Sequence, residues 1–437
     1  MNIFNLKNTS FLIFVTLLNV LNFVDRQFIA SFAPYLKEDL NLSNTDLGLL
    51  TGVVFIFFYV VAGLFMGTLA DRYNRTRIIG VGVVVWSVFT AASGMAKNFI
   101  QLAIPRLFIG VGESAMTPTA LSILSDRYEQ KKSATAVGIY YMGVPVGVGV
   151  SLIIAGYLGP AIGWRGCFYL LGFIGVFLGL MMLLVKDTPR KKVPVKTESK
   201  SFIQTMRLLF GALTKSKSLI FTIIAGTLYH MALGSASAFE QVWAVEEKGL
   251  DKAMFAQASG WIFAIFGVLG AIFGGTMSDW TLKKFNLPRT WFLLLITLLF
   301  TPLAFTRYYD PESILFWIGI CASAFSLGCF YGPVFAVIQE LVSSNLRATI
   351  VAFNLLCVNL LGFVPGSLIS GILMDNMLES VNSHPFAVAM HAQGTVLVYS
   401  NVLVGFAIMF LIMGTILYYL AGKYYESDRK KLNEIYG

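Results

Sequence analysis

Long apolar runs separated by short polar stretches cover most of this chain. The runs fall at about residues 10–36, 47–70, 77–96, 98–126, 134–162 and 165–185, and then at 219–246, 254–278, 289–306, 313–342, 346–375 and 395–421. A transmembrane helix needs about 20 apolar residues, whereas a transmembrane strand needs only about ten. The pattern therefore predicts an all-α integral membrane protein with 12 transmembrane helices.

The composition agrees with lipid as the main solvent. Of 437 residues, 57% are hydrophobic and 13% are charged, whereas soluble domains carry about 25% charged residues. The net charge of +9 does not indicate nucleic acid as a partner, because the basic residues collect in alternate loops. The four cysteines fall inside predicted helices, so no disulfide framework is expected.

The basic residues also predict the orientation in the membrane. If the N-terminus is cytoplasmic, 24 of the 32 Lys and Arg residues lie in inner segments and six in outer ones. Basic residues concentrate in the cytoplasmic loops of membrane proteins. We therefore expect both termini in the cytoplasm.

The polar segment 186–218 divides six predicted helices from six. It separates an N-terminal six-helix bundle (1–185) from a C-terminal bundle with a short cytoplasmic tail (219–437). Within it, the mixed apolar and basic pattern of Ser201–Thr214 indicates a short helix on the membrane surface. We favour a tether between the bundles over a lipid-responsive switch.

An internal repeat supports two pseudo-symmetric bundles. Gly67–Asp71 resembles Gly275–Asp279, 208 positions later, and Ser133–Thr135 resembles Arg347–Thr349 at an offset of 214. Repeated halves of this kind are typical of transporters that bind substrate between the halves, near the middle of the membrane.

Four ionisable residues lie inside the predicted first and fourth helices. Asp25 and Arg26 belong to NFVDRQFIA, and Arg106 and Glu113 to RLFIGVGESAMTP. Seven residues make about two turns, so Arg106 and Glu113 share a helix face, whereas neighbours such as Asp25 and Arg26 diverge by about 100°. Charges at this depth mark transport pathways or proton relays. Two acids and two arginines form a nearly neutral cluster, and gain or loss of one proton would change its net charge. Such a change in charge is what proton coupling requires. The alternative is that the four residues form purely structural buried pairs.

Two related loops follow the second and eighth predicted helices, GTLADRYNRTR and GTMSDWTLKK. Their candidate gating residues are Gly67, Asp71, Arg75 and Arg77 in the first and Gly275, Asp279 and Lys283 in the second. Glycine permits close helix packing, and aspartate can accept hydrogen bonds from a helix N-terminus. The loops resemble the signature of the major facilitator superfamily, which implies a gating latch. Anchoring by basic residues alone is the alternative, but it leaves the aspartates unexplained.

A closer resemblance covers nearly the whole chain. NFVDR, RLFIGVGES, GIYYMGVPVG and the stretch Tyr331–Gly362 together resemble the spinster-like family. This resemblance implies transport by alternating access, with Asp25, Arg26, Arg106 and Glu113 as the proton-coupling cluster. Animal members are associated with export of lysophospholipids and sphingosine phosphate. The chain departs from the family in VPGSLISGILMD, which lacks the usual Gly-Pro order, and in the acid Glu240.

Polar residues on the later helices are candidates for a substrate cavity. They are Glu240, Gln241, Tyr331, Gln339, Asn354 and Asn359. Glu240 could instead reach the outer surface, and the amide side chains could join helices by hydrogen bonds. His230 we interpret as a packing histidine rather than a proton relay.

These observations favour a proton-coupled secondary transporter for an amphipathic or anionic small solute, such as a lysophospholipid or sphingolipid-like molecule. A proton symporter for sugar acids is the alternative. A lipid-acting enzyme is disfavoured, because the sequence holds no metal-ligand spacing, GxSxG or phosphate-binding loop; a non-transporting receptor is also disfavoured. We expect no cofactor, with solute, protons and lipids as partners of a monomer in a bacterial inner membrane.

Overall fold

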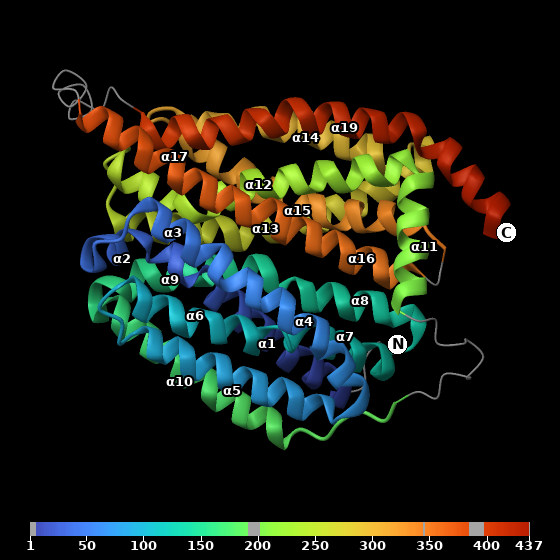
Figure 1. The fold of residues 1–437 in the computed structure, drawn as a ribbon, viewed down its shortest axis with the longest axis horizontal. Coiled ribbons are helices and arrows are strands. Elements are labelled where there is room, and N and C mark those ends of the chain that lie inside the picture. Colours follow the sequence, from blue (N-terminus) through green and yellow to red (C-terminus); the bar gives the residue numbers. More distant parts are fainter. Residues whose placement is uncertain (1–5, 191–201, 344–345, 384–396, 437) are drawn as a thin grey trace. The chain divides into compact units, whose positions relative to one another are not determined.

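Helices make up nearly all of the computed structural model, which describes residues 6–190, 202–343, 346–383 and 397–436 (Figure 1). Within these residues, 12 helical segments are long and apolar enough to cross a membrane. They are Asn8–Ser31, Asn44–Gly63, Arg75–Ser93, Phe99–Arg127, Thr135–Tyr157, Gly159–Leu184, Lys217–Glu246, Lys252–Phe285, Arg289–Tyr308, Ile314–Glu340, Thr349–Asn382 and Val398–Leu432. The prediction of an all-α protein with 12 transmembrane helices is confirmed.

The chain forms two compact units. The first comprises Met1–Lys192 with Ser237–Ala264 and Gly371–Ser380, and the second comprises Val193–Ala236, Ile265–Ser370 and Val381–Gly437. Parts of the seventh, eighth and eleventh spans therefore belong to the first unit. The division into two six-helix bundles at 186–218 stays a prediction.

Ten helices from the N-terminal region build most of the first unit. They are α1 (Leu6–Ser31), α2 (Ala33–Leu40), α3 (Asn44–Thr51), α4 (Val53–Arg72), α5 (Arg75–Ser93), α6 (Phe99–Glu113), α7 (Met116–Arg127), α8 (Gln130–Tyr141), α9 (Gly143–Tyr157) and α10 (Gly159–Leu184). A capping box of Ser43 and Asp46 begins α3, because each residue's side chain accepts a hydrogen bond from the other's backbone N–H. Asn98 caps α6 by accepting from the Gln101 N–H at 3.0 Å.

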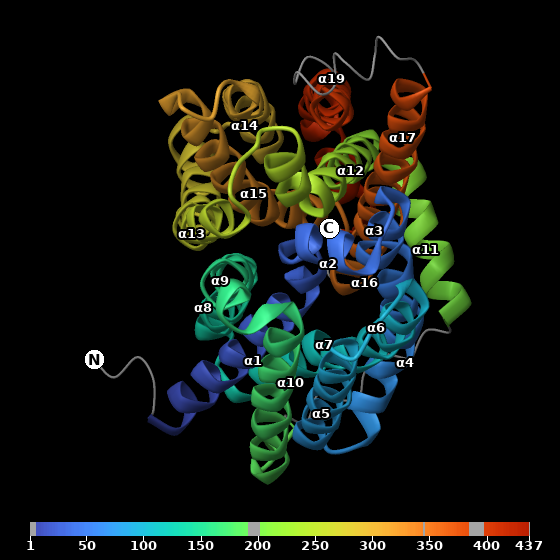
Figure 2. The same cartoon turned by 90° about the vertical axis from the view of Figure 1, so that its left-hand side faces the viewer.

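Glycines allow the helices of the first unit to approach closely. The helix α5 lies between α6 and α10 (Figures 1 and 2). A Cβ on Gly82 of α5 would lie 2.8 Å from the carbonyl oxygen of Gly112 in α6. A Cβ on Gly172 of α10 would lie 2.6 Å from the carbonyl oxygen of Ser87 in α5. Larger residues would force these helices apart, so this packing fixes α6, which carries two of the predicted cluster residues.

The later helices that enter the first unit are held there by specific contacts. They are parts of α12 (Lys217–Glu246), α13 (Lys252–Phe285) and α17 (Val364–Asn382). The carboxylate of Asp375 in α17 accepts hydrogen bonds from Asn44 and Thr45 at the start of α3. Gln257 Nε2 in α13 donates to the carbonyl oxygen of Gly156 in α9 at 2.9 Å.

The second unit is built from the remaining helices. They are α11 (Phe202–Lys215), the rest of α12, α13 and α17, α14 (Arg289–Ala304), the 3-10 turn η1 (Phe305–Tyr308), α15 (Ile314–Glu340), α16 (Arg347–Leu356), the π-helix η3 (Cys357–Phe363) and α19 (Val398–Tyr436). The helix α14 packs against both α15 and α19. The eleventh span widens into a π-helix at η3, a geometry often found at functional sites.

The helix α11 covers most of the stretch predicted to lie on the membrane surface. Leu209 and Leu213 are buried in the core of the second unit, while Arg207 and Phe210 are exposed. Just beyond α11, Ser216 Oγ donates to Asp428 at 3.1 Å. One apolar face of α11 therefore packs against the core of the second unit. The position of α11 on a membrane surface stays a prediction.

Candidate functional site

The four ionisable residues of the first and fourth spans lie together in the first unit, paired between α1 and α6. Arg26 Nε donates to Glu113 Oε2 at 2.8 Å. Arg106 Nη1 donates to the backbone oxygen of Asp25 at 3.1 Å and lies 3.5 Å from its Oδ1. Each acid therefore pairs with the arginine of the other helix. We call these four residues the charge cluster.

The charge cluster is almost completely buried within the first unit. The side chains of Asp25, Arg106 and Glu113 are 3%, 2% and 0% exposed, whereas that of Arg26 is 20% exposed. An unpaired charge at such a site costs several kcal/mol of desolvation, and breaking one buried pair costs about 3–5 kcal/mol. Arg26 is the most exposed member, so the Arg26–Glu113 pair is the more accessible of the two.

Aromatic rings surround the two arginines of the charge cluster, and one carboxylate oxygen in the cluster has no hydrogen-bond partner. The guanidinium carbon of Arg26 lies 4.2 Å from the ring centre of Tyr59, and that of Arg106 lies 4.5 Å from the ring centre of Phe55. Such cation–π contacts are worth about 0.5–2 kcal/mol. Glu113 Oε1 is buried without a hydrogen-bond partner. Glu113 can therefore take up a proton on Oε1 without giving up the hydrogen bond from Arg26 to Oε2.

Sequence reasoning missed one polar partner of the charge cluster and two asparagines on the same face of α1 as Arg26. The hydroxyl of Thr90 in α5 donates to Asp25 Oδ2. Asn19 Nδ2 donates to the carbonyl oxygen of Tyr140 at 2.8 Å, and the amide atoms of buried Asn22 have no partner. The three- and four-residue steps between Asn19, Asn22 and Arg26 place them on one face of α1. That spacing was the available signal for the two asparagines, whereas nothing in the sequence singled out Thr90.

Arg75 is the centre of the first loop motif. It is buried at the start of α5, where its guanidinium contacts the carboxylates of Asp126 in α7 and Asp187 after α10. Its Nη2 also donates to the carbonyl oxygen of Thr188 at 2.6 Å. Arg75 therefore joins three segments of the first unit, whereas Arg77 is exposed.

The structure says less about the other candidate gating residues Gly67, Asp71 and Gly275. Gly67 and Asp71 fall near the end of α4, but their side-chain surroundings lie outside the described residues. A Cβ on Gly275 would meet nothing within 4 Å, so this glycine is not required by close packing.

The second loop motif reproduces part of the first. Arg289 Nη2 donates to Asp279 Oδ1 at 2.6 Å, and Arg289 Nη1 donates to Glu340. The Arg289–Glu340 pair stands 214 positions after Arg75–Asp126, the same offset as one of the sequence repeats. Lys283 is exposed. Each compact unit therefore contains an arginine–carboxylate pair at the equivalent place in the repeat.

We expect Arg75→Lys to lower the stability of the protein moderately. Lysine keeps the charge, but it lacks the planar fork that contacts Asp126 and Asp187 together. The loss of hydrogen bonds to charged groups should cost about 1.5–3 kcal/mol, seen as a lower thermal unfolding midpoint in detergent. The exposed neighbour provides the control, because Arg77→Lys should leave the midpoint unchanged. Equal midpoints for all three proteins would show that Arg75 is not a structural centre.

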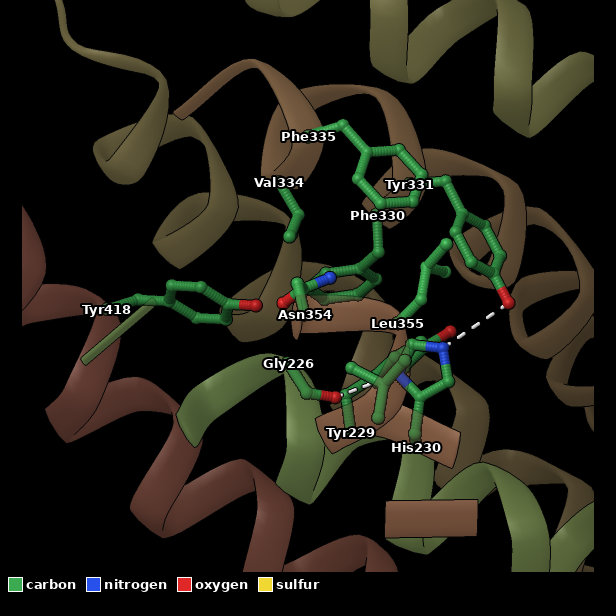
Figure 3. A pocket seen from close by; sticks show the side chains of 11 residues that line it. Gly226, Tyr229, His230, Phe330, Tyr331, Val334, Phe335, Asn354, Leu355 and Tyr418 are labelled. Atoms are coloured by element: carbon green, nitrogen blue, oxygen red, sulfur yellow. Dashed lines mark hydrogen bonds between the residues drawn. The ribbon is translucent and has the colours of Figure 1, made fainter. Parts of the chain in front are cut away.

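A pocket with polar and aromatic walls lies within the second unit (Figure 3). It is lined by Gly226, Tyr229, His230, Phe330, Tyr331, Val334, Phe335, Asn354, Leu355, Val358 and Tyr418. The ring of His230 connects two of its walls, with Nδ1 2.8 Å from the carbonyl oxygen of Gly226 and Nε2 3.3 Å from the hydroxyl of Tyr331. The rings of Tyr229 and Phe330 stack with centroids 4.2 Å apart.

The six residues considered for a substrate cavity do not form one group. Tyr331 and Asn354 line the pocket of the second unit. Gln339 and Asn359 instead donate to backbone oxygens four residues earlier in their own helices, at 3.0 and 2.8 Å. Glu240 and Gln241 belong to the first unit and are 7% and 5% exposed; their assignment to a cavity stays a prediction.

Comparison with known proteins decides the family. The sequence model described as Major Facilitator Superfamily matches residues 15–367. The chain belongs to the major facilitator superfamily. Members of this superfamily are membrane transporters, which points to a transporter rather than an enzyme. Among the described residues, no group of His, Cys, Asp and Glu is arranged to hold a metal ion.

Several curated proteins are similar to this superfamily member over most of their length. An MFS-type efflux pump of Mycolicibacterium smegmatis is 26% identical over 95% of this chain and 92% of its own. The Bacillus subtilis hexuronate transporter is 27% identical over 83% and 87%. A probable sphingolipid transporter, spinster homolog 1 of Arabidopsis thaliana, is 26% identical over 83% of each chain.

Solved structures support the spinster resemblance. A bacterial homologue of the human lysosomal transporter spinster, in an inward-facing and occupied conformation, is 25% identical with a TM-score of 0.81, covering 96% of this chain and 98% of that one. Its inward-facing, unoccupied form gives a TM-score of 0.82 at 24% identity, covering 97% and 99%. The resemblance to the spinster-like family that the motifs indicated is confirmed.

Proposed function

We propose that this major facilitator is a proton-coupled secondary transporter for an amphipathic or anionic small solute, such as a lysophospholipid or a sphingolipid-like molecule. The observation that carries the proposal is the charge cluster, with two buried ion pairs and an unbonded oxygen on Glu113. Buried ionisable groups within a membrane span are expensive to maintain and are typical of ion pathways. The relatives named as sphingolipid transporters support the solute class.

The geometry suggests how proton and solute binding are linked. Proton uptake on Glu113 Oε1 would cancel the negative charge that now neutralises Arg26. The guanidinium of Arg26 would then keep only a neutral hydrogen bond to Glu113, and its remaining N–H groups could pair with an anionic group, which arginine recognises through two parallel hydrogen bonds. Protonation and anion binding therefore favour the same state of the protein. Asp25 and Arg106 would stay paired and position the first helix.

Alternating access also needs contacts that break and re-form. We assign this role to the residues of the two loop motifs, Gly67, Asp71, Arg75, Arg77, Gly275, Asp279 and Lys283. The hydrogen bonds between Asp375 in α17 and Asn44 and Thr45 at the start of α3 support a second set of gating contacts. These join the second and eleventh spans on the side that the basic residues assign to the outside.

A proton symporter for sugar acids is the second candidate. Two relatives favour it, the hexuronate transporter of Bacillus subtilis and the probable L-galactonate transporter of Escherichia coli, which is 25% identical over 86% of this chain and 84% of its own. The proposed role of Arg26 applies equally to a carboxylate or a phosphate.

For either solute class, we propose that the protein is a monomer in a bacterial inner membrane with both termini in the cytoplasm.

Transport by the purified protein in liposomes tests this proposal. We expect uptake of radiolabelled oleoyl-lysophosphatidic acid to increase when the outside is made more acidic, and to lose this increase after addition of a protonophore. Albumin removes lysolipid from the outer leaflet, and protein-free liposomes measure spontaneous flipping. Uptake indifferent to the gradient would contradict proton coupling. Inhibition by unlabelled glucuronate, with no uptake of lysolipid, would favour the second candidate.

A further inference from the structure

Two buried polar atoms in the pocket of the second unit have no hydrogen-bond partner. They are Oδ1 of Asn354 in α16 and the hydroxyl oxygen of Tyr418 in α19, and the two residues are 2% and 0% exposed. Figure 3 shows the amide of Asn354 and the hydroxyl of Tyr418 pointing toward one another. Because an unsatisfied buried polar group is destabilising, the presence of two such atoms in one pocket requires an explanation.

The remainder of the pocket is lined by aromatic and aliphatic side chains and has no acidic residue, lysine or arginine. The stacked rings of Tyr229 and Phe330 form part of its wall. Since the carbonyl oxygen of Gly226 only accepts, His230 Nδ1 carries the proton in that contact. In the neutral ring, Nε2 then accepts from the Tyr331 hydroxyl. The existing hydrogen bonds therefore satisfy His230 without an ionised partner.

We propose that this pocket is a binding subsite for an uncharged, hydroxyl-bearing part of the transported solute. A hydroxyl both donates and accepts, so one such group can donate to Asn354 Oδ1 and accept from the hydroxyl of Tyr418. The aromatic walls then contact the carbons beside the hydroxyl. A charged headgroup does not fit here, because no opposite charge repays its desolvation. The inference rests on the proposed transport function and narrows the solute to one with a hydroxyl beside an apolar segment.

A structural water is the competing occupant, and stability distinguishes the two. If a permanent water bridged Asn354 and Tyr418, it would satisfy both atoms, and Tyr418→Phe would remove a stabilising hydrogen bond. If the solute satisfies them, the solute-free protein contains a buried hydroxyl without a partner. Tyr418→Phe then removes a destabilising group, so the solute-free protein should be at least as stable as the parent while it binds solute less well.

Binding measurements on the full chain in lipid nanodiscs test the subsite. The probes are oleoyl-lysophosphatidic acid, which has a free hydroxyl beside its acyl chain, and the analogue in which hydrogen replaces that hydroxyl. We expect Tyr418→Phe and Asn354→Leu each to weaken binding of the hydroxylated probe about fivefold to tenfold. Binding of the deoxy probe should be unchanged. The matched control is Tyr419→Phe, whose exposed side chain is the next residue along α19.

Two results would overturn the inference. One is equal affinity of the parent protein for the two probes, together with no effect of Tyr418→Phe. The other is a lower unfolding midpoint of solute-free Tyr418→Phe, which would identify a structural water. The response of transport to a pH gradient is measured separately, so failure of the subsite and failure of proton coupling are distinguishable.

Discussion

Replacement of Glu113 by Gln is expected to abolish the response of transport to a pH gradient while leaving the protein folded. Glutamine has nearly the same shape and its carbonyl oxygen can still accept the hydrogen bond from Arg26, but it cannot exchange a proton. The guanidinium of Arg26 would keep its contact with the ring of Tyr59 and its partial access to solvent. We therefore expect downhill exchange of solute to continue, because the change removes coupling rather than the binding group.

The measurement compares uptake with and without an imposed gradient in liposomes containing each protein. For the parent, the gradient should raise the initial rate, whereas for Glu113→Gln the two rates should be equal. Glu38→Gln is the control, since Glu38 is a largely exposed acid of the first unit that lies outside the charge cluster, and its response to the gradient should match that of the parent. If the gradient still raised the initial rate of uptake by Glu113→Gln, Glu113 would be excluded as the coupling site.

The sequence was sufficient for the spans and for the membership of the charge cluster, because both depend on local signals. Apolar runs of helical length identify spans without reference to their neighbours. The 100° step between adjacent residues already required Asp25 and Arg26 to point in different directions. The sequence did not reveal that Arg26 pairs with Glu113 or that Thr90 donates a hydrogen bond to Asp25, because those contacts depend on how α1, α5 and α6 pack.

The cavity residues were harder to predict, since a polar residue in a membrane helix has several ways to satisfy its side chain. Gln339 and Asn359 bond to the backbone of their own helices, a choice of rotamer that no sequence pattern determines. Asn354 differs because its Oδ1 lies in a pocket without a partner. That distinction depends on Tyr418, which comes from a distant helix and gave no signal of its own.

The contact made by Asp375 also could not be predicted from the sequence, because it joins two distant segments. Its segment, VPGSLISGILMD, stood out in the sequence only as a departure from the family pattern. In the structure, the carboxylate accepts from the backbone N–H groups and side chains of Asn44 and Thr45, with four hydrogen bonds of 3.0, 2.9, 2.8 and 2.7 Å. It therefore lies at the positive end of α3, where a negative charge is favoured.

We expect Asp375→Asn to shift the protein toward a state in which the second and eleventh spans separate. Asparagine keeps the shape but loses the charge and one acceptor oxygen, so the contact should weaken by about 1.5–3 kcal/mol. If this contact forms in only one of two conformations, the ratio of their populations should change about 10- to 150-fold.

Spin labels report the shift directly. They are attached at Met95→Cys and Ile314→Cys, two exposed positions, after replacement of the four native cysteines by Ala. The distance distribution of Asp375→Asn should gain a population that is minor in the parent. Glu246→Gln is the control, because its ion pair with Lys37 is partly exposed and such pairs contribute only about 0–1 kcal/mol. If Asp375→Asn and Glu246→Gln gave the same distribution as the parent, Asp375 would be a packing contact within the first unit and the gating role would have to lie elsewhere.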